Sequence, residues 1–219
     1  MLLSYLTVKG YGEHEINIQR SRFITYIDRA TTEEEAQQFI EKIKKKHWDA
    51  THNCSAYLIG ENDEIQKAND DGEPSGTAGV PILEVLKKRR LKDTVVVVTR
   101  YFGGIKLGAG GLIRAYGGAT SEGLNAVGVV ERKLMQVMHN TIDYHWLGKV
   151  ENELRQSPYI LKEINYLEQV EVQAYVKKED TDQFVDWMTN LTSGQASIVT
   201  GEVQYLENPV AGTFSDAES

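Results

Sequence analysis

The sequence predicts an α+β protein of two domains, and three observations lead to this prediction. The back part of the chain alternates strand-like and helix-like segments in the order β-α-β-β-α-β, which places two helices on one face of a four-stranded sheet, as in ferredoxin-like domains. The front part sets amphipathic helical stretches around one unbroken β-branched run, residues 94–99. Composition and charge change together near residue 135. We therefore expect domains over 1–134 and 135–210, followed by a flexible tail over 211–219.

The front domain opens with paired strands and a helix. Apolar residues alternate with polar ones over 13–19 and, less regularly, over 22–27, so these segments are expected to form a hairpin or consecutive pair. Thr32 and Glu35 have the spacing of a capping box and predict a helix of about four turns, with Lys44, Lys45 and Lys46 at the end that favours cations. The segments that follow are strands over 53–60 and 64–68 and a polar, turn-rich loop over 69–77.

A second helix, a buried strand and a third helix complete this domain. The second helix begins near Val80, has Pro81 in its first turn and ends at cations 87–90. Residues 93–100 form the clearest strand, and its run of four valines predicts a central position in the sheet, buried on both faces. A glycine-rich loop follows, and then a helix over 112–127.

The second domain shows two apolar helix stripes between strands. Leu147, Val150 and Leu154 form one stripe. In the other helix, Asp180 is the expected N-cap and Gly194 the stop. The expected strands cover 134–144, 159–167, 169–177 and 196–206, and the expected helices cover 145–156 and 180–192.

Composition excludes several classes of protein. The chain has 219 residues, of which 41% are hydrophobic and 26% charged, as in an ordinary globular protein. Its longest uninterrupted apolar run, Val95 to Val98, is far shorter than the roughly 20 residues that cross a bilayer. No secretory signal is visible, and the single cysteine, Cys54, excludes an internal disulfide framework. We expect a cytoplasmic protein without a membrane partner.

The net charge of −8 is unevenly distributed. Residues 1–136 hold 19 Lys and Arg against 18 Asp and Glu, a net of +1, whereas residues 137–219 hold 5 against 14, a net of −9. The front part can therefore approach phosphate through local basic clusters, while the acidic back part is repelled from bare nucleic acid.

The glycine-rich loop is the first candidate site. It connects the valine-rich strand to a helix, so backbone N–H groups and the helix dipole are available to an anion, and cations surround it. Its spacing fits neither a Walker loop nor a dinucleotide fingerprint. The alternative is a tight connection in which the glycines allow turns and close packing of the chain. Inside the next helix, the pair Gly117 and Gly118 likewise indicates close packing or a kink. The candidate residues here are Arg100, Tyr101, Gly103, Gly104, Lys106, Gly108, Gly110, Gly111 and Arg114.

An acidic loop is the second candidate. Asp70, Asp71 and Glu73, with Ser75 nearby, could hold Mg²⁺ beside a phosphate or exchange protons, although the EF-hand spacing is absent. A solvated turn is the alternative. Proximity to the glycine loop would favour a site over a turn.

His52 and Cys54 lie two residues apart, so they share one face of an extended strand. This is the arrangement of a cysteine nucleophile, but a single cysteine on a strand more often serves as a small buried hydrophobic residue. The remaining histidines are scattered, so no metal site is expected.

Three blocks of sequence carry a family resemblance: THNCSAY (51–57), DDGEPSGTAGVPIL (70–83) and VTRYFGGIKLGAGGLIRAY (98–116). Together they resemble the signature of the IMPACT family, and the whole layout is similar to its bacterial YigZ/YvyE-type members. The resemblance implies a first domain with the left-handed βαβ architecture of a small-subunit ribosomal protein and the GHMP kinases. It implies a ferredoxin-like second domain similar to the last domain of elongation factor G. Besides the candidate residues given above for the glycine and acidic loops, the signature positions are His52, Asn53, Pro74 and Leu107.

The resemblance implies a link to translation. Eukaryotic relatives regulate translation by competing for an activator of an initiation-factor kinase, but they use an additional N-terminal domain that this sequence does not contain. We expect a non-enzymatic, translation-associated protein without a cofactor, whose front domain binds RNA or the ribosome through the glycine loop, with His52 beside it. The second domain is expected to contact protein. The alternatives are an enzyme that handles a small phosphorylated molecule with the acidic loop and Mg²⁺, and a protein-interaction module.

Overall fold

The computed structural model describes residues 1–210 and divides the chain into two compact units. The first unit contains Tyr5–Glu131, with Met1 and residues 208–210. The second unit contains Arg132–Glu207 with Leu2–Ser4. The tail predicted over 211–219 lies outside the described residues.

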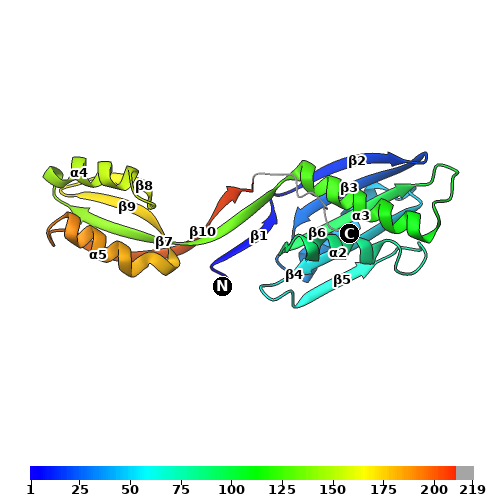
Figure 1. Ribbon diagram of the computed structural model, residues 1–219, viewed down its shortest axis with the longest axis horizontal. Coiled ribbons are helices and arrows are strands. Elements are labelled where there is room, and N and C mark those ends of the chain that lie inside the picture. Colours follow the sequence, from blue (N-terminus) through cyan, green and yellow to red (C-terminus); the bar gives the residue numbers. More distant parts are fainter. Residues whose placement is uncertain (211–219) are drawn as a thin grey trace. The chain divides into compact units, whose positions relative to one another are not determined.

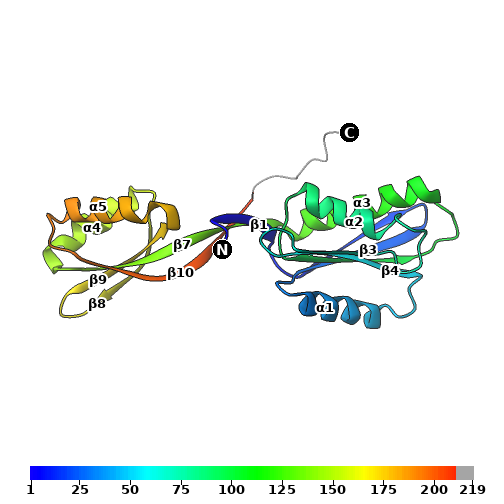
Figure 2. The ribbon, with the colours of Figure 1, turned by 90° about the horizontal axis from the view of Figure 1, so that it is seen from below.

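The first unit is a five-stranded antiparallel sheet covered by helices on both faces (Figures 1 and 2). Its central strand β6 (Thr94–Tyr101) is buried from Thr94 to Arg100, which confirms the position that the valine run predicted. Helix α1 (Glu33–Lys46) covers one face, and α2 (Gly79–Lys88) and α3 (Gly108–Val127) cover the other. The strands follow the order β2 (Gly12–Ile18), β3 (Ser21–Arg29), β6, β4 (His52–Ile59) and β5 (Ile65–Asn69).

Helix α1 forms as its sequence predicts. The side-chain oxygen of Thr32 accepts a hydrogen bond from the backbone N–H of Glu35, and the Glu35 carboxylate accepts one from the backbone N–H of Thr32. The apolar side chains of the helix, which include Phe39 and Ile43, pack onto the sheet. This capping box fixes the start of the helix, since two otherwise unpaired N–H groups are satisfied there.

Helix α3 begins at Gly108, four residues before the predicted start. Its glycines have low helix propensity, which hid this first turn, but Leu112 and Tyr116 pack into the core and hold the turn in place. The expectation for Gly117 and Gly118 is also wrong in part. A Cβ at Gly117 would only touch Val85 at 4.0 Å, and a Cβ at Gly118 would meet nothing within 4 Å, so close packing does not require either glycine.

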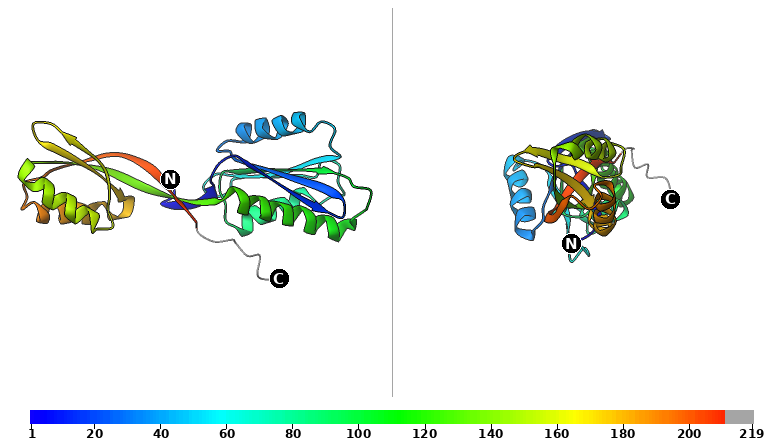
Figure 3. Two further views of the ribbon diagram at one scale, coloured as in Figure 1. Left: turned by 90° about the horizontal axis from the view of Figure 1, so that it is seen from above. Right: turned by 90° about the vertical axis from the view of Figure 1, so that its left-hand side faces the viewer.

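The second unit has the ferredoxin-like strand order, with its helices α4 and α5 on one face of the sheet (Figure 3). The order is β10, β7, β9, β8, so the first and third strands of the βαββαβ unit are central. Tyr159 packs edge-on against Phe184, with ring centroids 4.8 Å apart, in an apolar core. The elements are β7 (Val129–Ile142), α4 (Tyr144–Arg155), β8 (Ile160–Tyr166), β9 (Val170–Lys177), a 3-10 turn η1 (Lys178–Asp180), α5 (Thr181–Leu191) and β10 (Ser197–Pro209).

Two differences from the sequence expectations concern strands. Strand β1 (Ser4–Val8) was not predicted, because five residues give too short a pattern; it pairs with β7. Strand β7 begins five residues earlier than expected and belongs to both units.

Asp180 stands at the N-cap of α5, but its side chain makes no capping hydrogen bond. Within residues 1–210, no helix is both long and apolar enough to span a membrane.

Candidate functional site

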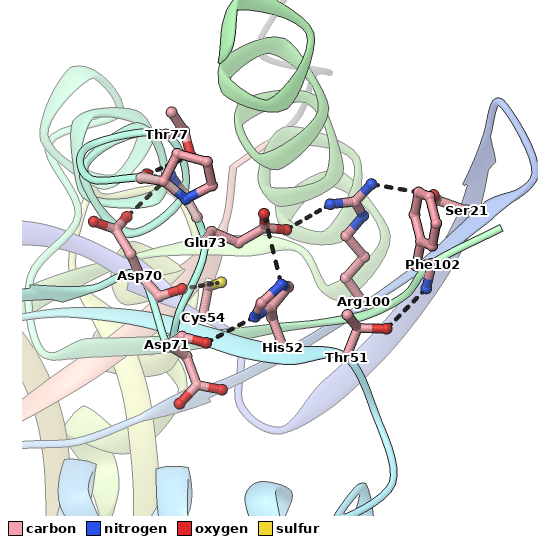
Figure 4. Close-up of polar contacts among 12 residues, drawn as sticks. Ser21, Thr51, His52, Cys54, Asp70, Asp71, Glu73, Thr77, Arg100 and Phe102 are labelled. Atoms are coloured by element: carbon pink, nitrogen blue, oxygen red, sulfur yellow. Dashed lines mark hydrogen bonds and ion pairs between the residues drawn. The ribbon is translucent and has the colours of Figure 1, made fainter. Parts of the chain in front are cut away.

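The acidic loop and the glycine loop of the first unit meet at one cleft of about 380 Å³. The acidic loop contributes Glu73 and Pro74, and the other side is formed by the end of β6 and the first turn of α3. Figure 4 shows the polar side chains around Arg100. The lining residues are Thr51, His52, Glu73, Pro74, Arg100, Phe102, Lys106, Leu107, Gly108, Ala109 and Leu112.

A buried ion pair forms the floor of the cleft. Arg100 Nη1 lies 2.7 Å from Glu73 Oε1, and the two residues are 5% and 8% exposed. The Tyr116 hydroxyl also donates to Glu73 Oε1, at 2.7 Å, and burial raises the pKa of Tyr116, so that it stays protonated. Removing either charge would leave the other buried without a partner, so this pair holds the acidic loop against the end of β6.

Arg100 retains one unsatisfied donor. Its Nη2 donates to the Ser21 hydroxyl at 3.3 Å, but its buried Nε has no hydrogen-bond partner among the described residues. A buried donor without an acceptor is energetically unfavourable. The cleft therefore contains a cation that its protein neighbours only partly satisfy.

His52 faces the same floor from β4. Its Nδ1 is 2.8 Å from the backbone oxygen of Asp71, which can only accept a hydrogen bond, so Nδ1 carries the proton. Nε2 lies 3.7 Å from Glu73 Oε2. The histidine thereby presents Nε2 toward the polar end of the cleft.

Asp70 and Asp71 maintain the loop instead of facing the cleft. The Asp70 carboxylate accepts from the N–H groups of Gly76, Ala78 and Gly79; burial alone would raise its pKa, but these bonds hold the pKa below its ordinary value. The Asp71 carboxylate accepts from the Asn53 N–H at 2.7 Å and pairs with Lys44 at 2.6 Å. In Figure 4 it points away from Glu73 and Arg100.

The acidic loop therefore offers little to a metal ion. Asp70, Asp71 and Glu73 each direct their oxygens toward different protein partners. Ser75 is exposed and does not line the cleft. Residues 1–210 contain no group of three or more His, Cys, Asp or Glu side chains that could hold a metal ion.

Cys54 is a buried structural residue. Its thiol donates to the backbone oxygen of Asp70 at 3.0 Å, and burial raises its pKa to about 12. A thiol with such a pKa is protonated at neutral pH, and the nucleophile is the thiolate. The geometry therefore favours the packing role over the catalytic one.

The backbone amides after β6 are only partly used within the protein. The N–H of Phe102 donates to Thr51 Oγ1 at 3.0 Å, and the N–H of Gly103 donates to Ser21 Oγ at 3.3 Å. The amides from residue 104 to residue 110 have no acceptor within the part of the chain that the structure describes. They include the first N–H groups of α3, where a helix offers donors to an anion.

The glycines of this loop serve different purposes. A Cβ at Gly103 would overlap the backbone oxygen of Arg20, so this glycine permits two chain segments to pack closely. Gly104 and Gly108 have φ angles of +89° and +69°, which favour glycine. Of the five candidate glycines, Gly108 lines the cleft, whereas Gly103, Gly104, Gly110 and Gly111 do not.

Two side chains that were expected at the site lie elsewhere. Tyr101 is on the opposite face of the sheet, where its hydroxyl is 2.8 Å from His47 Nδ1 and donates to Asp49 at 3.2 Å. Strand alternation puts Phe102, not Tyr101, in the cleft. Arg114 lines a separate hollow between α2 and α3, with Glu84 among its neighbours.

Sequence reasoning did not place Thr51, Ala109, Leu112 or Ser21 at the site. Ser21 is 79 positions from Arg100 and reaches it because β3 pairs with β6. Such long-range strand pairing cannot be predicted from the spacing of neighbouring residues. Thr51 opens the THNCSAY block, and its position directly before His52 was the one available signal.

Comparison with known proteins covers both units. Residues 19–124 match the Impact N-terminal domain, and residues 141–195 match a domain of unknown function, DUF1949. The chain is 70% identical to the IMPACT family member YvyE of Bacillus subtilis over 210 residues, which is 96% of this chain and 97% of that protein. It is 37% identical to the Protein IMPACT homolog of Dictyostelium discoideum over 102 residues, 45% of this chain and 29% of that protein.

A solved structure has the same fold. The crystal structure of a hypothetical protein matches with a TM-score of 0.59 at 29% sequence identity, over 92% of this chain and 99% of that one.

Proposed function

The chain belongs to the IMPACT family, and we propose that it is a cytoplasmic, translation-associated regulator whose first unit binds the phosphate backbone of RNA. The match to the Impact N-terminal domain covers residues 19–124, which contain the cleft, and the similarity to a eukaryotic IMPACT homolog supports the regulatory role at the level of the family. Most of the RNA that a translation factor contacts is ribosomal RNA. The proposal therefore includes the ribosome as the partner.

One observation carries this proposal: unpaired main-chain amides and cations converge on the same cleft. The cleft-lining residues 106–109 have backbone amides that lack acceptors within residues 1–210, and those that open α3 add the positive end of its dipole. Lys106 is exposed at the cleft, and Arg100 lies in its floor. Phosphate supplies the acceptor oxygens that these donors lack.

The second unit would contribute differently. Residues 137–219 carry a net charge of −9, which repels RNA. We propose that this unit contacts protein, so that RNA binding falls to the first unit alone. The same proposal includes the division of the chain into a first domain that ends at residue 134 and a second domain that begins at residue 135.

The enzyme alternative is less favoured by the geometry. It requires free carboxylates beside the phosphate, but Asp70, Asp71 and Glu73 are bonded to the protein itself. Among the described residues that line the cleft, Glu73 carries the one carboxylate, and it is bound to Arg100 and Tyr116.

Binding to a 20-nucleotide single-stranded RNA and to purified ribosomes tests the proposal. With about three phosphate contacts, affinity for the RNA should fall about 20-fold between 50 and 200 mM salt. Lys106→Ala should weaken binding and flatten the salt dependence by nearly one unit of slope. Lys45→Ala is the matched control, because Lys45 is an exposed lysine of α1, on the other face of the sheet.

Absence of salt-sensitive binding to both RNA and ribosomes at 50 mM salt would contradict the proposal. Equal effects of Lys106→Ala and Lys45→Ala would show that binding depends on overall charge instead of this cleft.

A further inference from the structure

We propose that the cleft holds one unpaired nucleotide of an RNA strand, with its base against Phe102 and its phosphate on the amides that begin α3. This inference rests on the proposed function and narrows it from RNA in general to single-stranded RNA. It follows from the division of the cleft into an apolar part and a donor-rich part.

The apolar part of the cleft suits a nucleobase. Phe102 is 46% exposed, and its side chain lines the cleft. Pro74, Leu107 and Leu112 line the same cleft. An aromatic ring exposed beside aliphatic side chains offers a stacking surface to any base.

Phe102 is also held in place. Its backbone N–H donates to Thr51 Oγ1, and the Arg100 guanidinium carbon lies 5.5 Å from its ring centroid. Arg100 is itself fixed by Glu73 and Ser21. Little side-chain ordering is therefore needed when a base stacks on this ring.

The donor-rich part suits the phosphate of the same nucleotide. The amides at the start of α3 and the Nε of Arg100, which has no acceptor among the described residues, are independent donors on this side of the cleft. Gly108 and Ala109 carry two of these amides and line the cleft together with Phe102. One ligand with a flat apolar part and an anionic part matches both.

The size of the cleft sets the number of nucleotides. A volume of about 380 Å³ is near the lower end of the roughly 300–1,000 Å³ found for small-molecule sites. That volume suits a single nucleotide. A base inside a duplex is already stacked and paired, so it cannot enter without a cost of a few kcal/mol.

Fluorescence anisotropy with the full chain tests this inference. The probes are a 12-nucleotide single-stranded RNA, the same strand annealed to its complement, and adenosine and uridine 5′-monophosphates as competitors. We expect the single strand to bind at least 10-fold more tightly than the duplex at equal salt. Phe102→Ala should weaken binding to the single strand by about 5- to 150-fold, since base stacking on an aromatic side chain is worth about 1–3 kcal/mol. It should leave binding to the duplex unchanged.

Phe102→Leu is the matched variant. It keeps an apolar side chain but removes the aromatic ring, so it should lose most of the affinity that Phe102→Ala loses. Because Phe102 is half exposed, thermal denaturation should show that both variants are folded.

Each outcome is informative. Equal binding of duplex and single strand, or full affinity in Phe102→Ala, overturns the inference while leaving RNA binding intact. A mononucleotide that binds as tightly as the RNA strand also overturns it, because the occupant would then be a free nucleotide. If native protein binds no RNA, the proposed function fails as well.

Discussion

Replacement of Ala109 by aspartate separates the stability of α3 from anion binding in the cleft. Ala109 is the second residue of the helix, is exposed and lines the cleft. An aspartate in the first helical turn is stabilised by the dipole by about 0.3–1 kcal/mol, which offsets a helix-propensity cost of up to about 0.7 kcal/mol relative to alanine. The free energy of unfolding should therefore change by no more than about 0.7 kcal/mol.

The same substitution should greatly weaken RNA binding. A carboxylate about 5 Å from a bound phosphate costs about 1 to 3 kcal/mol for effective dielectric constants between roughly 80 and 20. That corresponds to an increase in Kd of about 5- to 150-fold. Asparagine has nearly the same size as aspartate without its charge, so Ala109→Asn should bind far better than Ala109→Asp.

Anisotropy titrations with single-stranded RNA at 50 mM salt measure Kd, and urea denaturation measures stability. The electrostatic reasoning would be refuted if Ala109→Asp, fully folded, bound RNA with native affinity. Equal weakening by the aspartate and asparagine variants would also refute it, since size alone would then explain the loss.

Three further predictions concern stability. Glu73→Ala should lower the free energy of unfolding, measured in urea, by about 3–5 kcal/mol, because it leaves the Arg100 charge buried without its partner; a loss below 1 kcal/mol would contradict this. Gly103→Ala should destabilise the protein by at least 1 kcal/mol because its Cβ would overlap the Arg20 backbone, whereas Gly118→Ala should stabilise α3 by up to about 1 kcal/mol; similar melting temperatures for the two variants would argue against this packing. Burial raises the pKa of Cys54 to about 12, whereas the thiol of the unfolded chain ionises near pH 9. The contribution of Cys54 to stability should therefore be complete below pH 9 and fall as the pH rises from 9 to 12. Iodoacetamide should label the thiol at pH 8 only after unfolding, and rapid labelling of folded protein would contradict the burial.

Local signals predicted much of the fold. The capping box at Thr32 and Glu35 marks the start of α1 because the two side chains and two N–H groups involved are close in sequence. The valine run of β6 is apolar on both faces and therefore has to be central. The first turn of α3 was missed because the packing of Leu112 and Tyr116, which holds it, is tertiary.

The candidate site was harder to predict than the fold. The two loops that line the cleft were identified from their residue types, and the structure brings them together. The roles of individual residues depend on long-range pairing: Asp70 caps α2, and Ser21 reaches Arg100 from another strand. The sequence could not show which of Tyr101 and Phe102 lines the cleft, because this depends on which face of the sheet points toward the cleft.

The donors of this cleft belong mainly to the main chain, and this has a consequence for genetics. An amide N–H at residues 104–110 is retained whatever side chain replaces the native one, unless proline is introduced. A library of alanine variants would therefore leave these donors intact and report only on side chains such as that of Lys106 and on the glycines whose φ angles are positive. The contribution of the amides to anion binding is inherited with the shape of the loop, whichever side chains the loop carries.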